Sequence, residues 1–445
     1  MAKIRTLDVG IDFTKPRRYA NCTQAVKLAD QPFGGFISPK LFKRGDFIDE
    51  STRCELVDFM SKENLHPTVI GVVVDYLTRF VMELENMVLM ESKGDLLGRS
   101  VGIGQYLECL AIPSYGASRA DLSDESFGEA YSWSTFSGLV SAFNIACREY
   151  IDMSECGKKN LDWTDELFEK VLSDNVIFAM CQLTAFDNLY RSGRALDDKT
   201  FDMQVGTGKH IVTYSVHSTL IPDEITTSHI RTMVKNAWSV LKSDVAEMRA
   251  LNPKGYLKEY RRFHPRFHIM FPLGMPRKIA KADADFEIPG TLVDMKVSKN
   301  DSIDKQQTLQ IIIYYIMQWA ELLGLGTGAR ECPDCCFGEE PDKDRDFSLE
   351  LGLQSCMILN PRQGIVWRLD VKDVDTDVLC RIVDEVMGGY EGIDTRAFIE
   401  AIKIFDVEKR KEVLSELVKE RRKVLHELTE RKNEECFSKY ANNKE

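Results

Sequence analysis

Apolar residues recur at three- and four-residue intervals through most of the first 220 residues, and this spacing predicts a mostly helical N-terminal portion. The clearest helical stretches are 67–90, 135–150 and 165–190. The segments 93–126 and 193–202 are richer in Gly, Ser and Asp, which predicts polar loops.

The hydrophobic period changes after a helical pattern at 225–250, falling toward two in a series of short runs that predict strands. These runs are 266–271, 284–288, 291–297, 356–360 and 365–371. The apolar stretch 306–323, between the third and fourth runs, predicts a packed helix. This order of elements predicts an α/β (α+β) fold in which helices flank a mixed sheet.

We expect three parts along the chain. A mostly helical region at 1–222 contributes the first core helix near 67–90 and an insertion at 93–220, and a core at 223–400 follows it. The segment 401–445 is highly charged and predicts a C-terminal helix.

That C-terminal helix carries a short heptad-like stripe. Leu414, Val418, Leu425 and Leu428 follow the spacing over about two repeats, with Arg421 inside the stripe. Coiled coils usually need three or four repeats, so we expect a helix packed on its own domain. The alternative is that this stripe binds a protein partner or a second copy of the chain.

Composition places the chain among folded proteins without a membrane span. It has 445 residues and a formal net charge of −12, and its apolar runs are far shorter than the roughly 20 residues that cross a bilayer. The N-terminus lacks the pattern of an export signal, so we expect a cytoplasmic protein. In that compartment the 12 cysteines are expected to be free thiols rather than disulfides.

Candidate chemistry lies in the segment 281–297, where Pro289-Gly290 predicts a hairpin turn. A two-residue turn would pair Ile288 with Thr291 and, further along, Asp285 with Asp294. Alternation along the strands then puts five polar positions on one face together with Leu292: Asp283, Asp285, Glu287, Asp294 and Lys296. The other face would be apolar: Ala284, Phe286, Ile288, Val293, Met295 and Val297.

Directly opposed carboxylates are unfavourable in a sheet unless a cation compensates them. A hard divalent ion such as Mg²⁺ is a natural compensator, because it binds through one or two carboxylates and keeps waters for a phosphate substrate. Lys296 lies on the same predicted face as Asp294 and could stabilise charge that develops on a phosphate. The chemistry that these residues favour is metal-assisted phosphodiester hydrolysis.

These residues resemble the PD-(D/E)XK nuclease superfamily, in particular its RecB-type exonuclease-like branch. The matching pattern is an Asp on one strand (Asp285), a short hairpin, Asp-x-Lys at 294–296, and a following helix with Gln310 and Tyr314 as Gln-x-x-x-Tyr. The match covers 266–324.

The resemblance implies a restriction-endonuclease-like sheet and a set of site roles. Asp285, Asp294 and the main-chain carbonyl of Met295 would hold Mg²⁺ or Mn²⁺. Lys296 would assist the attacking water, and Gln310 would support the site. Asp283 is a rival for the role of Asp285, because a shifted turn or bulge would bring it opposite Asp294.

The family often places a further acid on an earlier core helix. Gly71 and Asp75 resemble the opening of that helix, with Arg79 following. Glu83 is the candidate acid and Glu85 its rival. Both also fit exposed positions on an amphipathic helix.

A basic stretch leads into the predicted hairpin and would suit contacts with a phosphate backbone. The residues that we expect to contact nucleic acid are Arg262, Arg266, Arg277, Lys278, Lys299 and Tyr314. Cys332 and Cys335 form one CxxC pair, which is half of a structural zinc site, and a structural zinc is the less favoured interpretation.

The sequence therefore predicts a Mg²⁺- or Mn²⁺-dependent nuclease acting on DNA, of the kind found in bacterial or phage systems for DNA processing or defence. The alternative is a non-cleaving nucleic-acid-binding or scaffold subunit built on the same fold. Walker A, dinucleotide-binding and serine-hydrolase motifs are absent from the sequence, which counts against those classes.

Overall fold

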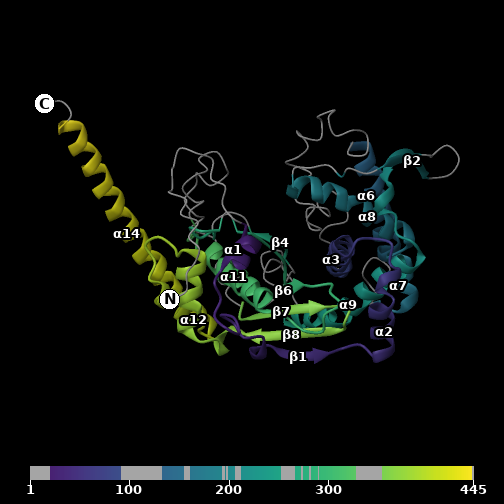
Figure 1. Ribbon diagram of the computed structural model, residues 1–445, viewed down its shortest axis with the longest axis horizontal. Coiled ribbons are helices and arrows are strands. Elements are labelled where there is room, and N and C mark those ends of the chain that lie inside the picture. The colour runs from purple at the N-terminus through teal and green to yellow at the C-terminus, as the bar shows by residue number, and fades with distance from the viewer. Residues whose placement is uncertain are drawn as a thin grey trace.

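A six-stranded mixed sheet forms the centre of the protein (Figure 1). The computed structural model describes residues 21–91, 133–154, 161–192, 196, 199–205, 212–251, 266–271, 274–279, 282–288, 290–326 and 353–442. The strand order is β1-β8-β7-β6-β5-β4. The strands are β1 (Lys43–Asp46), β4 (Arg266–Met270), β5 (Asp283–Ile288), β6 (Thr291–Met295), β7 (Ser355–Asn360) and β8 (Ile365–Asp370).

All neighbouring strands are antiparallel except β6 and β7, which run parallel. Parallel strands need a long crossover connection, and the segment between β6 and β7 contains the helix α11 (Lys305–Leu322). Asp304 caps this helix by accepting hydrogen bonds from the backbone N–H groups of Gln306 and Gln307. The crossover therefore starts directly after the strand that carries the Asp-x-Lys sequence.

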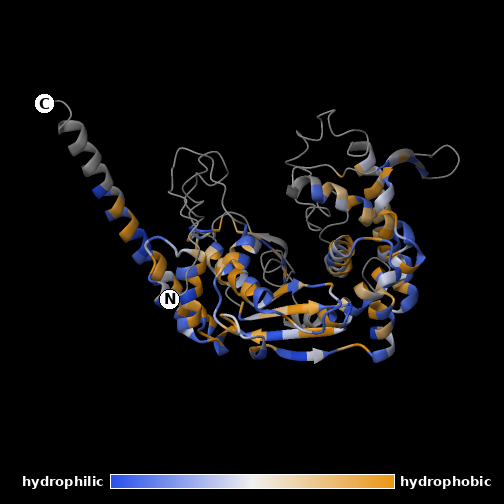
Figure 2. Ribbon diagram, in the orientation of Figure 1, coloured by the Kyte–Doolittle hydropathy of each residue, from blue (hydrophilic) through white to orange (hydrophobic). Residues whose placement is uncertain are grey.

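Two hydrophobic cores lie on opposite faces of the sheet. On one face, α11 packs with the C-terminal helices over Leu292, Ile358 and Trp367. On the other face, the helical region packs over Val293, Met357 and Leu359. Figure 2 shows the central strands as mostly hydrophobic, as expected of strands covered on both faces.

The remaining elements divide between the two faces. The helical region contains α2 (Glu50–Asp58), α3 (Pro67–Glu91), α6 (Trp133–Met153), α7 (Asp165–Val171), α8 (Asp174–Ser192), α9 (Glu224–Leu251) and a hairpin of β2 (Thr200–Val205) with β3 (Val212–His217). The α11 side contains α1 (Cys22–Leu28), α12 (Thr376–Arg381), a π-helix at Ile382–Met387, α13 (Thr395–Ile402) and α14 (Val407–Asn442). Short 3-10 helices are Pro39–Leu41, Met60–Lys62, Ser218–Leu220 and Val371–Asp373.

The helix α14 is the longest element and projects away from the body in Figure 1. Its first part is docked, because Leu414 is buried and the Arg421 guanidinium donates to the carbonyl oxygens of Gly324, Leu325 and Glu391. The residue that interrupts the apolar stripe thus fastens the helix to its own domain. None of the helices in the described ranges has both the length and the apolar composition needed to cross a bilayer.

The predicted α/β class is confirmed, and the predicted strands from residue 266 onward all form. The single helix predicted at 165–190 is wrong, because the chain breaks after Val171 into α7 and α8. The strand β2 begins inside the predicted polar loop 193–202. The strand β1 was not predicted: its sequence, Lys-Arg-Gly-Asp, has no apolar period, and its backbone pairing with β8 holds it in place.

A buried ion pair joins the helical region to the sheet. Arg362, in the turn between β7 and β8, makes two hydrogen bonds to the Glu63 carboxylate, at 2.7 and 3.0 Å. His229 of α9 lies 2.8 Å from the same carboxylate, and Arg362 also donates to the Leu56 carbonyl. Burial raises the pKa of Glu63, but its contacts with His229 and Arg362 outweigh burial and hold that pKa below its usual value.

Replacing Glu63 with Gln should lower the free energy of unfolding by about 3 kcal/mol, because it leaves the buried Arg362 charge without a counter-ion. The matched control is Glu50→Gln, which removes an exposed partner of Arg53 and should change stability by less than about 0.5 kcal/mol. Urea denaturation measures both. Equal effects of the two substitutions would show that the buried pair does not hold the two regions together.

Candidate active site at the end of the β5–β6 hairpin

The predicted hairpin forms in the predicted register. Ile288 pairs with Thr291, and Phe286 pairs with Val293. Gly290 has a φ of 77°, a left-handed value that suits Gly at the turn. The hairpin therefore brings Asp285 and Asp294 to the same end of the two strands.

The ladder between β5 and β6 ends at Phe286 and Val293, which corrects the predicted pairing of Asp285 with Asp294. In place of that pair, the Asp285 carboxylate accepts a hydrogen bond of 2.7 Å from the Met295 backbone N–H. Ala284 also departs from the predicted face, because it packs in the core beneath α11 with Leu292. Beyond Phe286, β5 stays paired with β4 as far as Asp283 but is no longer paired with β6.

Asp294 and Lys296 form the centre of the site. The Lys296 Nζ lies 2.9 Å from Oδ1 and 2.8 Å from Oδ2 of Asp294. Asp294 is only 3% exposed, whereas the Lys296 side chain is 27% exposed. The buried Oδ2 has no hydrogen bond of favourable geometry and so keeps capacity to accept one or to bind a cation.

Arg79 of α3 joins the site from the helical region. It is 1% exposed, and its guanidinium makes two contacts with the Asp75 carboxylate, one of them a 2.9 Å hydrogen bond from Nε. The same guanidinium lies 3.6 Å from Asp285 Oδ1. Arg79 thus links two carboxylates, one on the helix and one on the strand.

Close packing of α3 against the sheet makes this contact reachable. A Cβ added at Gly71 would lie 3.8 Å from the Val297 side chain, so the helix passes directly beside the chain that follows β6. Asp75 and Arg79 are spaced one turn apart beyond Gly71 and face the same way. The sequence pattern singled out both residues but predicted no role for them. Two opposite charges one turn apart in an otherwise apolar helix are the signal that could have predicted their buried ion pair.

Three of these side chains have pKa values shifted by their surroundings. Burial raises the pKa of Asp294 to about 6, with the Asp285 charge adding to the shift and Lys296 opposing it. Burial would lower the pKa of Lys296, but the carboxylates of Asp294, Asp285 and Asp75 outweigh it and raise that pKa. The Arg79 pKa is likewise raised by Asp75 and Asp285 against the effect of burial. Lys296 and Arg79 are therefore firmly cationic.

Tyr314 and Gln310 lie behind Asp294, on α11. The Gln310 amide donates a 2.8 Å hydrogen bond to the Tyr314 hydroxyl, as their spacing of four residues allows. Tyr314 is 5% exposed, and burial together with the charges of Cys22 and Asp294 raises its pKa well above the usual value. Burial also raises the pKa of the Cys22 thiol to about 12, and this thiol is hydrogen-bonded to Tyr314.

The position of Tyr314 corrects its predicted role as a nucleic-acid contact. Its ring packs inside the α11 core, stacked with Phe271 at a centroid distance of 6.0 Å, so it does not lie on the surface. Gln310 supports Tyr314, and through Tyr314 it is placed near the acids. Tyr314 therefore lies in the core near Asp294, whose charge contributes to its raised pKa.

The other predicted residues fall in several places. Asp283 is on β5 and half-buried, but Asp285 is the one that contacts Met295 and Arg79. Glu83 and Glu85 lie on α3, with side chains outside the described part of the structure. The same holds for the side chain of Arg266 on β4, and Arg262, Cys332 and Cys335 lie outside the described residues altogether.

The three predicted basic contacts that are described, Arg277, Lys278 and Lys299, are exposed. The Lys278 ammonium donates to the Glu385 carbonyl at 2.8 Å, so part of its hydrogen-bonding capacity is used within the protein. Lys299 follows Lys296 by three residues and Asp294 by five.

The donor set suits a hard divalent ion only in part. Asp285 and Asp294 supply oxygen ligands of the type that Mg²⁺ prefers, and Asp294 Oδ2 has capacity to spare. Within the described ranges, however, no three or more His, Cys, Asp or Glu side chains gather closely enough to form a metal site by themselves. A metal bound here would therefore need the Met295 carbonyl and waters in addition to the two acids.

Two cationic side chains of the protein itself lie beside the two acids. Lys296 neutralises Asp294 and Arg79 neutralises Asp285, so the protein itself supplies two cations to the pair. Asp75 adds a third carboxylate, which leaves one net negative charge on these five side chains.

Comparison of the chain with protein-family models, with curated proteins and with solved structures finds no match. The geometry of the site is therefore the basis for inferring its function.

The raised pKa of Asp294 predicts a pH-dependent stability. Between about pH 6 and pH 4 the folded protein holds a proton on Asp294 that the unfolded chain does not. The free energy of unfolding should therefore rise as the pH falls through this window, by on the order of 1–2 kcal/mol from this group. Asp294→Asn should lack this contribution and should be more stable than the wild type at pH 7 to 8.

Urea denaturation at several pH values in EDTA measures this contribution as the difference between Asp294→Asn and the wild type. Asp301→Asn, at an exposed acid in the following loop, is the control and should follow the wild type. A difference between Asp294→Asn and wild type that stays constant from pH 4 to 8 would contradict the burial cost.

Proposed function

We propose that this protein is a metal-dependent nuclease that hydrolyses phosphodiester bonds of DNA. The observation that carries the proposal is the convergence of Asp285, Asp294 and Lys296 at one end of the β5–β6 hairpin, with Lys296 Nζ within 2.9 Å of both Asp294 oxygens. Two acids and one ammonium group around a single point match the needs of phosphodiester hydrolysis. The resemblance to the PD-(D/E)XK superfamily supports the same conclusion.

In this proposal, Asp285, Asp294 and the main-chain carbonyl of Met295 would hold Mg²⁺ or Mn²⁺. The ion would supply a water of lowered pKa and neutralise charge on the phosphate. Arg79 fixes the orientation of Asp285 through its contact at 3.6 Å, and the Met295 N–H holds the other carboxylate oxygen. These two contacts leave Asp285 with little freedom to turn away from Asp294.

Lys296 is placed to act on the substrate. Its ammonium contacts Asp294, and its raised pKa keeps it protonated at neutral pH. When a cation takes its place beside Asp294, the ammonium can turn toward the solvent-exposed side and stabilise charge on a phosphate or orient the attacking water. Lys296 therefore acts as a charge-stabilising group, and no proton has to leave it.

Asp294→Ala should abolish Mg²⁺-dependent cleavage, reducing it by at least 10³-fold, while binding of DNA in EDTA remains within about threefold of wild type. The reason is that Asp294 is the most buried of the proposed ligand residues. Plasmid cleavage and fluorescence anisotropy measure the two properties. Asp301→Ala, which removes an exposed acid seven residues away, should cleave normally. Full activity in Asp294→Ala would remove the site assignment.

Lys299→Ala should weaken DNA binding about uniformly across sequences and lower the slope of log affinity against log salt by about 1. Lys299 is exposed next to the site, so it is free to contact one phosphate. Lys170→Ala is the control, because the Lys170 charge is already neutralised by Glu166 at 2.8 Å. A salt slope equal to that of wild type would exclude Lys299 from the DNA contact.

The second candidate is a non-cleaving subunit that binds nucleic acid or acts as a scaffold. It is favoured by the internal neutralisation of both acids, since Lys296 and Arg79 already occupy the places beside them. Incubation of plasmid with the wild-type protein in Mg²⁺, in Mn²⁺ and in EDTA separates the two functions. Cleavage in either metal supports the nuclease, and binding without cleavage supports the scaffold.

A further inference from the structure

Three successive carbonyl groups directly after the Asp-x-Lys sequence are held by two side-chain amides. The Asn360 amide donates to the Ser298 and Asn300 carbonyl oxygens, at 2.9 and 3.1 Å. The Gln363 amide donates to the carbonyl oxygen between them, that of Lys299. We call Asn360 and Gln363 the amide clamp.

The clamp residues are buried, and the Asn360 side-chain oxygen accepts hydrogen bonds from both the turn and the loop. Asn360 is 1% exposed, and its Oδ1 accepts from the backbone N–H groups of Arg362 and Gln363, at 3.2 and 3.3 Å. The same oxygen also accepts from the Ser298 backbone N–H at 3.4 Å, and the amide nitrogen donates to the two carbonyl oxygens of the loop. Replacing the donor alone would remove both contacts of Asn360 with the loop carbonyls and keep the contacts that its oxygen accepts.

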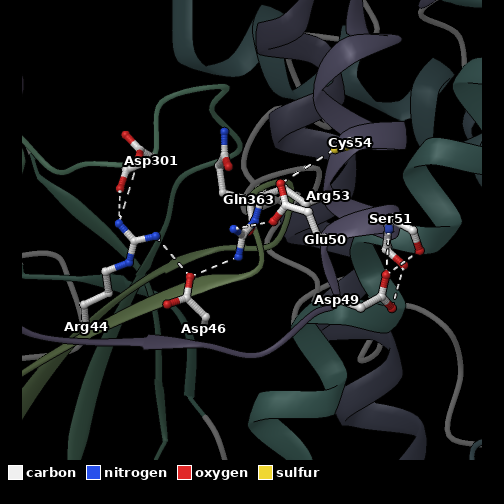
Figure 3. A network of polar contacts seen from close by, with 10 residues as sticks. Arg44, Asp46, Asp49, Glu50, Ser51, Arg53, Cys54, Asp301 and Gln363 are labelled. Carbon is white, nitrogen blue, oxygen red and sulfur yellow. Dashed lines mark hydrogen bonds and ion pairs between the residues drawn. The ribbon is translucent and has the colours of Figure 1, made fainter.

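The turn that carries the clamp is anchored in the helical region. Arg362 forms the buried ion pair with Glu63, and the Asn236 side chain of α9 donates to the Pro361 carbonyl at 3.0 Å. On the outer side, the Arg53 guanidinium of α2 donates to the Gln363 carbonyl at 2.9 Å (Figure 3). The helical region thus fixes the place of the turn.

The loop is also held at its beginning and end. The Lys296 backbone N–H donates to the Leu359 carbonyl at 2.9 Å, directly before Asn360. At the far end, Arg44 donates to the Asp301 carbonyl at 3.1 Å (Figure 3). The clamp lies between these two points, so it decides the path of the chain just beyond Lys296.

We propose that Asn360 and Gln363 are positioning residues, through which the helical region holds Lys296 against Asp294 and presents Lys299 to the substrate. The part of this inference that concerns catalysis rests on the proposed nuclease function. The part that concerns the placement of Lys296 does not.

Asn360→Asp is the main test, because the carboxylate keeps the acceptor that shapes the turn, loses the donor, and faces two carbonyl oxygens. Gln363→Met is the second variant, similar in length and without a charge. The matched control is Asn64→Asp. Asn64 makes the same kinds of contact, since it donates to the Ile221 carbonyl and accepts from the Asp223 N–H. These partners lie just before α9 and not in the loop at 298–300.

The first measurement does not depend on activity. Limited acetylation at pH 8, followed by peptide mass spectrometry, gives the labelling rate of Lys296 relative to exposed Lys299. The ion pair with Asp294 protects Lys296 in the wild type, so both clamp variants should raise this ratio severalfold, whereas Asn64→Asp should leave it within twofold. Circular dichroism melting checks that the variants compared are folded to the same extent.

The second measurement is steady-state cleavage of DNA in Mg²⁺. Both clamp variants should lower kcat at least tenfold, because Lys296 is displaced, with a smaller rise in KM from the displaced Lys299. A general loss of folded protein would instead lower the active fraction and leave KM unchanged. Asn64→Asp should retain the wild-type kcat.

The outcomes separate the clamp from the nuclease function. A labelling ratio that is unchanged in both clamp variants overturns the proposal, and so does a wild-type kcat in both of them. If the wild-type protein cleaves no DNA in Mg²⁺ or Mn²⁺, the nuclease function fails, and the labelling ratio alone then decides whether the clamp holds Lys296.

Discussion

The cost of burying the Asp294 carboxylate is the constraint around which this part of the protein is organised. A carboxylate that is 3% exposed needs a cation or a proton, and the protein provides Lys296 at 2.8 Å and keeps the pKa near 6. The same need extends outward, since Asp285 requires Arg79, and the buried Arg79 in turn requires Asp75. One buried charge thus dictates the placement of residues from two strands and a distant helix.

The local part of this arrangement could be predicted from the sequence. The register of the hairpin follows from a two-residue turn at Pro289-Gly290, and alternation then places Asp294 and Lys296 together. The strands that cross the core were predictable for the same reason, since a two-residue hydrophobic period is a local signal. The helix α11 was predictable from its length and apolar content.

The remainder depends on contacts between residues far apart in the chain. Nothing near Arg79 in the sequence indicates that its partner is Asp285, and nothing near Asn360 indicates the loop at 298–300. Tyr314 was assigned to the surface because an aromatic side chain in a motif gives no sign of its own burial. Hydrophobic periodicity shows which face of an element is covered, and it does not show which polar groups meet across the interface.

The pairing of β1 with β8 has a consequence for the behaviour of the protein in concentrated solution. Without its partner, β8 would present the free backbone edge of an apolar strand, and such edges associate with those of other molecules. The four residues of β1 cover that edge with Lys43, Arg44, Gly45 and Asp46, a short charged strand that offers the next molecule a poor template. This short segment therefore covers one edge of the sheet, and shortened forms of the chain that lack it would be expected to self-associate through β8.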